Sequence, residues 1–263
     1  MTQIDGTIVS IQPFPSPNPS VRLSTVTYIS SGLRVKGLLA EPDGNEPMDG
    51  FVYLRGGINN VGKVRPGRII QFAAEGMIVF APYYRGNLGG EGFEDFAGDD
   101  RNDAIAAVKV LEQLKRVNKI HVFGFSRGGI MALWTAVSVS GICSLVIWAG
   151  VSDMVLTYEE RVDMRRMMKR VIGGTPSKYP ELYNKRTPDE ELKKLECPIL
   201  IIHGERDSNV SIEQAKLLQS RLKKYGKKME TWYFADFTHF FPPQENRDTV
   251  KKLVNWMKAH SQS

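Results

Sequence analysis

The chain has 263 residues, of which 42% are hydrophobic and 24% are charged, and its formal net charge is +6. A chain of this length and composition can bury one large core, so we predict a single domain with at most a small insertion. The start of the chain lacks the basic and apolar regions of a signal peptide, and no stretch approaches the roughly 18 apolar residues of a membrane span. We therefore expect a soluble, cytoplasmic protein with no membrane partner.

The basic residues and the cysteines argue against two further classes of protein. The lysines and arginines are scattered and no nucleic-acid motif accompanies them, so we expect no nucleic-acid partner. Cys143 and Cys197 lie in apolar, strand-like runs, which is typical of reduced thiols and not of a disulfide scaffold or a metal site. We predict neither a metal nor another cofactor.

The first 20 residues form a proline-rich N-terminal segment in which the prolines argue against a helix. Two β-type runs at residues 23–30 and 33–40 are separated by Ser31-Gly32, which predicts a hairpin. From residue 51 on, short apolar runs alternate with amphipathic ones. We predict further strands at residues 51–54, 77–81, 120–123, 145–148, 199–202 and 230–234, and helices at 68–75, 100–117, 128–138, 212–225 and 245–258.

The alternation of strands and helices predicts the α/β class, with a mostly parallel sheet of about eight strands covered by helices on both faces. Residues 151–195 interrupt the pattern, because only helical patterns such as 155–171 occur there. We predict a small helical cap insertion at 151–195 within one domain spanning 21–263. Two ordinary surface helices are the alternative.

The segment Gly124-Phe125-Ser126-Arg127-Gly128 fits the pattern G-x-S-x-G, in which a strand turns sharply into a helix and exposes a serine. The run before it reads as a buried strand and the run after it as a helix, which is the context that this motif requires. We predict that Ser126 is a nucleophile.

A serine nucleophile needs a base, and the chain has only four histidines. His121 lies inside the strand before the serine, His203 ends another strand, and His260 lies in the polar tail. His239 lies in a loop between the last predicted strand and the last helix, where it could reach the serine. We therefore predict His239 as the base.

The imidazole needs an acidic partner, and two aspartates compete for this role. Asp207 follows a predicted strand among turn residues, at the kind of strand end where functional residues gather. Asp153 follows the strand after Ser126, where its alternative role is to cap a helix. We favour Asp207, because the order Ser126, Asp207, His239 is that of the α/β-hydrolase fold.

Acyl transfer also needs hydrogen-bond donors for the oxyanion. The first predicted donor is the backbone N–H of Arg127, directly after the nucleophile. The second should come from Arg55-Gly56-Gly57-Ile58, which leaves the strand at 51–54, and either Gly57 or Ile58 could supply it. A plain glycine turn is the alternative.

Three arginines are candidates for contact with a substrate. Arg127, Arg55 and Arg85 all lie in segments predicted to border the site, and an arginine fork binds a carboxylate with two hydrogen bonds. The alternative, favoured for Arg85, is an internal ion pair with Glu91 or Asp95. For the Arg127 side chain, no acidic partner is obvious nearby in the sequence.

The insertion contributes a further candidate. Met164, Met167 and Met168 are flexible apolar residues that suit an adaptable pocket wall over the serine. Ordinary helix packing is the alternative.

Several segments together resemble the prolyl-oligopeptidase-like serine hydrolases, the catalytic domain of peptidase family S9. Tyr84-Arg-Gly-Asn-Leu-Gly-Gly-Glu-Gly92 is similar to the family's Y-R-G-S-x-G-x-G segment. The serine elbow, the strand that leads to Asp207 and the His239 loop are also similar to family motifs, and the resemblance spans roughly residues 21–263. It implies an α/β-hydrolase fold and cleavage of peptides or carboxylic esters through an acyl-enzyme, with no cofactor.

The chain departs from this family in three ways. About twenty residues precede the first predicted strand, too few for the propeller domain of the oligopeptidases. Arg55 stands where members have Tyr or His, and Arg127 replaces a common aromatic residue. We expect a hydrolase of small esters or short peptides, with esters favoured. An aminopeptidase or oligopeptidase is the first alternative, and an inactive domain kept for binding is the second.

Overall fold

The computed structural model describes residues 4–59 and 61–261, and these form one nine-stranded sheet in the order β1-β2-β3-β5-β4-β6-β7-β8-β9. Strands β1, β2 and β3 pair antiparallel and β3 pairs antiparallel with β5, whereas all pairs from β5 to β9 are parallel. The strands are β1 Ile8–Phe14, β2 Val21–Ser30, β3 Leu33–Pro42, β4 Met48–Leu54, β5 Ile78–Pro82, β6 Val117–Phe125, β7 Ile142–Trp148, β8 Ile199–Gly204 and β9 Met229–Phe234.

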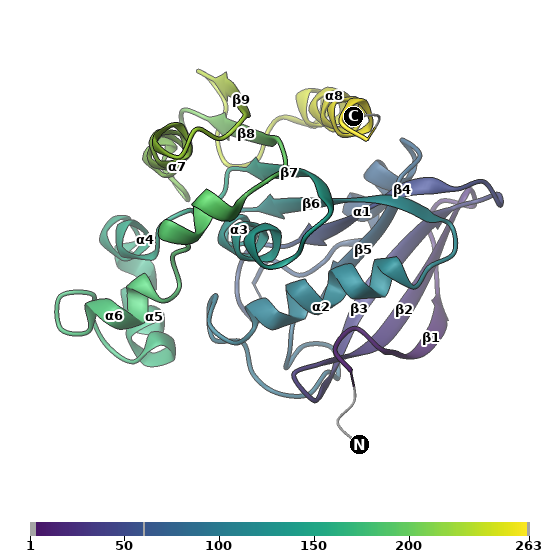
Figure 1. The fold of residues 1–263 in the computed structure, drawn as a ribbon, viewed down its shortest axis with the longest axis horizontal. Coiled ribbons are helices and arrows are strands. Elements are labelled where there is room, and N and C mark those ends of the chain that lie inside the picture. The colour runs from purple at the N-terminus through teal and green to yellow at the C-terminus, as the bar shows by residue number, and fades with distance from the viewer. Residues whose placement is uncertain (1–3, 60, 262–263) are drawn as a thin grey trace.

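Helices cover both faces of the sheet, as Figure 1 shows. They are α1 Pro66–Ala73, α2 Arg101–Glu112, α3 Gly128–Ser138, α4 Met154–Glu160, α5 Arg165–Ile172, α6 Pro180–Asn184, α7 Ile212–Lys224 and α8 Pro243–Ala259, with 3-10 turns at Val162–Met164 and Glu190–Lys194. Two buried clusters result, one on each face. Helices α2, α3 and α7 share one cluster with the insertion, and α1 and α8 share the other. The predicted α/β class and the α/β-hydrolase arrangement are confirmed.

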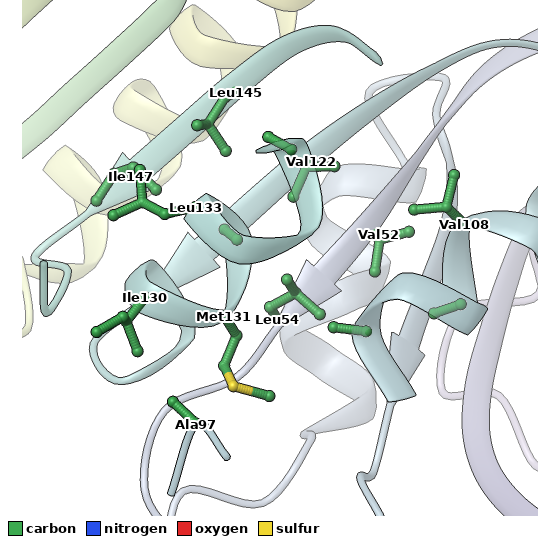
Figure 2. Packing of buried hydrophobic residues seen from close by; sticks show 14 of the residues in the cluster. Val52, Leu54, Ala97, Val108, Val122, Ile130, Met131, Leu133, Leu145 and Ile147 are labelled. Atoms are coloured by element: carbon green, nitrogen blue, oxygen red, sulfur yellow. The ribbon is translucent and has the colours of Figure 1, made fainter. Parts of the chain in front are cut away.

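The core is apolar because the parallel strands are buried on both faces. Figure 2 shows side chains of the first cluster, in which Val52, Val122 and Ile147 of three neighbouring strands face Leu133 of α3 and Val108 of α2. On the other face, the rings of Phe51, Tyr53, Phe72 and Phe123 pack together, with Tyr53 and Phe123 stacked at 5.1 Å between centroids. This packing fixes β4 and β6, two of the strands whose carboxyl ends lead into the site.

Two elements differ from the sequence prediction. Strand β1 lies in the N-terminal segment where we predicted no strand, and it raises the number of strands to nine. Its side chains are mostly exposed, with Val9 and Ile11 among them, because β1 is an edge strand that pairs only with β2. The helix predicted at 155–171 is broken at Arg161, whose φ of −99° and ψ of 73° are not helical.

Residues 151–195, where we predicted a cap insertion, contain α-helices and 3-10 turns and no strand. The short helices α4, α5 and α6 gather at one side of the molecule in Figure 1. Met154, Met168 and Tyr183 of these helices are buried against the first core cluster. Within the described part of the chain, no helix is long and apolar enough to cross a membrane.

Candidate active site

Ser126 occupies a tight turn between β6 and α3 in a left-handed backbone conformation, with φ of 56°. Such a conformation costs a non-glycine residue energy, and it persists only where neighbouring contacts fix it. Its N–H donates to Trp148 O at 3.2 Å, and its carbonyl accepts from the N–H groups of Gly129 and Val151, each at 2.9 Å. The predicted strand–turn–helix elbow is present, and the Ser126 residue is partly exposed.

His239 and Asp207 meet at the carboxyl edge of the same sheet. His239 Nδ1 lies 2.7 Å from Asp207 Oδ2, and both residues are buried, with 6% of their surface exposed. Asp207 Oδ1 accepts from the backbone N–H groups of Asn209 and Val210, at 2.8 and 2.9 Å. The carboxylate is thus fixed on both oxygens. Because a carboxylate only accepts, Nδ1 donates to it and Nε2 remains an acceptor for a proton.

The imidazole lies beside the serine elbow. The ring of His239 packs on that of Phe125, the residue directly before Ser126, with 4.8 Å between centroids. The loop that carries the histidine is also tied to the loop after β8, since Arg206 N–H donates to Phe237 O at 3.0 Å. Three segments distant in the sequence therefore bring Ser126, Asp207 and His239 to one edge of the sheet.

Asp153 has a different position, at the start of α4. Its Oδ1 accepts from Leu156 N–H at 2.9 Å, which is the N-cap role considered for it. Its Oδ2 lies 2.7 Å from Arg221 Nη2 of α7. Both oxygens of Asp153 thus hold the insertion in place.

The glycine pair after β4 lies against the serine. A Cβ atom at Gly56 would be 2.6 Å from Ser126 Cβ and 3.0 Å from its Oγ, so only glycine allows this approach. Among residues 4–59 and 61–261, no acceptor takes the backbone N–H of Gly57, Ile58 or Arg127. Unpaired N–H groups on both sides of a serine are what an oxyanion hole requires, so all three stay candidates.

The three arginines proposed to bind substrate have internal partners. Arg55 and Arg127 are only 3% and 2% exposed, and the guanidinium groups of both bond to the carboxylate of Glu94. Arg127 also pairs at 3.0 Å with Asp100, an acid that is not near it in the sequence. Acids distant from Arg127 in the sequence reach it because the loop after β5 packs over the elbow.

Arg85 is paired as well, but not with the acids that we expected. It forms a buried ion pair with Asp103 of α2 at 2.8 Å, in place of Glu91 or Asp95. In the insertion, Met168 is fully buried in the core, whereas Met164 and Met167 are half-buried and pack on its edge. These contacts favour internal roles for the three arginines and for Met168, and they leave Met164 and Met167 as candidates for a pocket wall.

Glu94 and Asp100 were not predicted to be site residues. Burial raises the pKa of Asp100 to about 7, against the attraction of Arg127 and with added repulsion from Asp95. Burial would also raise the pKa of Glu94, but Arg127 and Arg55 outweigh it, so the pKa of Glu94 lies below its usual range. Glu94 follows the glycine-rich segment by two positions, and that proximity is the only signal in the sequence.

The sulfur and acidic groups do not form a metal site in the part of the chain that the structure covers. No group of three or more His, Cys, Asp or Glu side chains is arranged to hold an ion there. Cys143 and Cys197 are free thiols, the first half-buried and the second buried.

Comparison with known proteins identifies the family of this chain. Residues 64–263 match the model of the prolyl oligopeptidase family. The chain is 61% identical over 254 residues to the "Uncharacterized peptidase YtmA" of Bacillus subtilis (strain 168), covering 95% of this chain and 99% of that protein.

Solved structures with low sequence identity share the fold. The acylaminoacyl peptidase of Pyrococcus horikoshii is 19% identical, with a TM-score of 0.76 over 94% of this chain but only 41% of the peptidase. Acetyl xylan esterase 1 from Thermoanaerobacterium sp. JW/SL YS485 is 14% identical, with a TM-score of 0.75 over 97% of this chain and 89% of the esterase. The family match and the sequence relative together show that this chain belongs to the prolyl oligopeptidase family and is a serine hydrolase.

Proposed function

We propose that Ser126, His239 and Asp207 form the catalytic triad of an enzyme that hydrolyses small carboxylic esters. The observation that carries this proposal is the buried hydrogen bond from His239 to Asp207, made directly beside the strained turn that presents Ser126. A carboxylate bound to Nδ1 fixes the tautomer in which Nε2 can take the serine proton, and it stabilises the imidazolium that forms.

The reaction then proceeds in two acyl transfers. Ser126 Oγ attacks the ester carbonyl while its proton moves to His239 Nε2, and the oxyanion is met by N–H groups from Arg127 and from Gly57 or Ile58. His239 returns the proton to the leaving alcohol as the carbon–oxygen bond breaks, which leaves an acyl-enzyme. Water, deprotonated by the same imidazole, attacks this ester and releases the acid, and the serine regains its proton.

Esters are favoured over peptides because of how much of each relative the chain matches. It covers 89% of an acetyl xylan esterase but only 41% of an acylaminoacyl peptidase. Short peptides are the second candidate, supported by the sequence relative that is named a peptidase. The two free cysteines support a reducing compartment such as the cytoplasm.

The test is a substrate panel with the pure protein and its Ser126→Ala variant. We expect p-nitrophenyl esters of short acids to be hydrolysed faster than aminoacyl-p-nitroanilides, and we expect Ser126→Ala to lose both hydrolysis and labelling by a fluorophosphonate. A variant that keeps its activity and its labelling would disprove the assignment of the nucleophile. Faster anilide cleavage would instead establish the peptidase.

A further inference from the structure

Glu94 is a buried carboxylate at the centre of the segments that border Ser126. Its side chain is fully buried, and its two oxygens accept four hydrogen bonds. Oε1 accepts from Arg55 Nη2 at 3.0 Å and Arg127 Nη2 at 2.5 Å. Oε2 accepts from the backbone N–H of Asn59 at 2.5 Å and from Asn87 Nδ2 at 3.0 Å.

These donors come from both sides of the candidate oxyanion hole. Arg127 follows the serine, whereas Arg55 and Asn59 bracket the glycine segment after β4. One carboxylate therefore ties the elbow to the segment that would supply the second donor. It is also bonded to Asn87 in the glycine-rich loop after β5.

The bonds act on the direction of the amide groups themselves. Arg55 Nη1 donates to Gly56 O at 3.0 Å, and because a trans peptide is planar, this bond also sets the direction of the Gly57 N–H. The bond from Asn59 N–H to Glu94 fixes the peptide plane between Ile58 and Asn59. The backbone of Ile58 is therefore held on its carboxyl side. The amides of Gly57 and Ile58 therefore lie between two points that Glu94 fixes, one through Arg55 and one directly.

The negative charge of Glu94 is also needed between the guanidinium groups of Arg55 and Arg127. Arg55 and Arg127 face the same carboxylate oxygen of Glu94. Among the residues that the structure describes, the other carboxylate paired with either arginine is Asp100, which contacts Arg127. Burial lowers the pKa of Arg55, and repulsion by Arg127 lowers it further. Without the negative charge between them, the two guanidinium groups would repel each other and the segments that carry them would separate.

We propose that Glu94 is a positioning residue that sets the oxyanion hole of this enzyme, a role that rests on the serine-hydrolase function proposed above. It touches no reacting atom and acts through the backbone amides that it holds in place. Because an oxyanion forms only in the transition state, misplacing its donors lowers kcat and leaves KM nearly unchanged.

The experiment compares Glu94→Gln with two matched controls. Gln has one acceptor oxygen in place of two and no charge, so it cannot hold all four donors. Glu91→Gln changes a glutamate of the same loop. The Glu91 carboxylate accepts a hydrogen bond at 2.8 Å from the backbone N–H of Arg34, a residue of β3. Asp103→Asn weakens another buried arginine–carboxylate pair, that of Arg85. Within the described residues, this pair forms no hydrogen bond with residues 55–59.

The measurements are kcat and KM for the best ester, the second-order rate of fluorophosphonate labelling, and the unfolding free energy by denaturant titration. For Glu94→Gln we expect kcat to fall by ~10²-fold with KM within about 3-fold, and labelling to slow in parallel, since the phosphonate oxygen uses the same donors. We expect both controls to keep kcat within about 3-fold of the wild type, even though Asp103→Asn is destabilised.

Two outcomes would overturn the proposal while leaving the function intact. One is a Glu94→Gln enzyme with wild-type kcat, and the other is an Asp103→Asn enzyme that loses as much kcat as Glu94→Gln. If Glu94→Gln does not fold, Glu94→Asp replaces it, because it keeps the charge but withdraws the carboxylate by ~1.5 Å. A wild-type kcat in Glu94→Asp would then refute the role. Failure of the function itself is recognised separately, by hydrolysis that survives Ser126→Ala.

Discussion

Gly128 opens α3 directly behind the serine, and the structure leaves no room there for a side chain. A Cβ atom at this position would lie 2.0 Å from the carbonyl oxygen of Leu54 and 3.0 Å from that of Arg55. Ordinary C···O contacts are ~3.3–3.6 Å, so the start of α3 and the end of β4 would have to separate by more than ~1 Å. Both of the opposing atoms belong to the backbone, which cannot turn aside as a flexible side chain would.

The magnitude for Gly128→Ala is the difference of two effects. Alanine in a helix is favoured over glycine by ~1 kcal/mol, whereas forcing an extra carbon into packed surroundings costs ~1–3 kcal/mol and sometimes more. At a distance of 2.0 Å from Leu54 O we expect the upper end of that range, and a net loss of ~2 kcal/mol in the unfolding free energy. We also expect kcat to fall, because the displaced end of β4 leads into Gly56 and Gly57.

The matched control is Gly67→Ala in α1. A Cβ atom there meets nothing within 4 Å, and the backbone is not left-handed, so alanine should stabilise the protein by ~0.4–1 kcal/mol. Denaturant unfolding and phosphonate titration of active serines measure both variants. If Gly128→Ala unfolds at the same denaturant concentration as Gly67→Ala and keeps wild-type activity, the tight approach of α3 to β4 is wrong.

The remaining predictions concern carboxylates and the insertion. Asp207→Asn should lower kcat by ~10⁴-fold, whereas Asp153→Asn should keep kcat and, since asparagine still caps α4, lose only the ion pair with Arg221, ~1 kcal/mol of stability. The reverse ranking would move the acid to the earlier strand. Because burial raises the pKa of Asp100 from 3.8 to about 7, the folded chain holds one more proton between these values. The unfolding free energy should therefore fall as the pH rises from about 4 to about 7, by at most ~1.4 kcal/mol per pH unit, and denaturant titrations of Asp100→Asn should lack this slope. Replacing Met164 and Met167 by alanine should change the preference for acyl-chain length across an ester panel, and an unchanged profile would assign them to packing alone.

The buried parallel strands could be predicted from the sequence because each is a short, continuously apolar run, a pattern that distinguishes it from exposed elements. The run predicted at 199–202 became β8, Ile199–Gly204, and the run at 145–148 became the end of β7, Ile142–Trp148. Strand β1 could not be predicted this way. It is an edge strand with mostly exposed side chains, so its residues show no burial pattern, and pairing with β2 alone defines it.

The same contrast holds for the site. Ser126, Asp207 and His239 each follow a recognisable strand, and their order along the chain is informative. The partners of Arg55 and Arg127 carry no such signal, because Glu94 and Asp100 reach them only when the loop after β5 folds over the elbow. Local sequence predicts the position of a functional residue in the fold. Its ion-pair partner depends on contacts between segments that are distant in the sequence.

The contact between Phe125 and His239 has a consequence for the order in which the enzyme is made. The elbow needs only the chain up to Val151, but the histidine loop comes after β9, and it is seated by Phe241 against Trp148 at 5.0 Å between centroids. A chain leaving the ribosome therefore exposes Ser126, the proposed nucleophile, long before His239, the proposed base, is synthesised. Under the proposed mechanism the serine remains an ordinary alcohol until the last strand and helix dock, so we expect a nascent chain to carry no hydrolytic activity toward its surroundings.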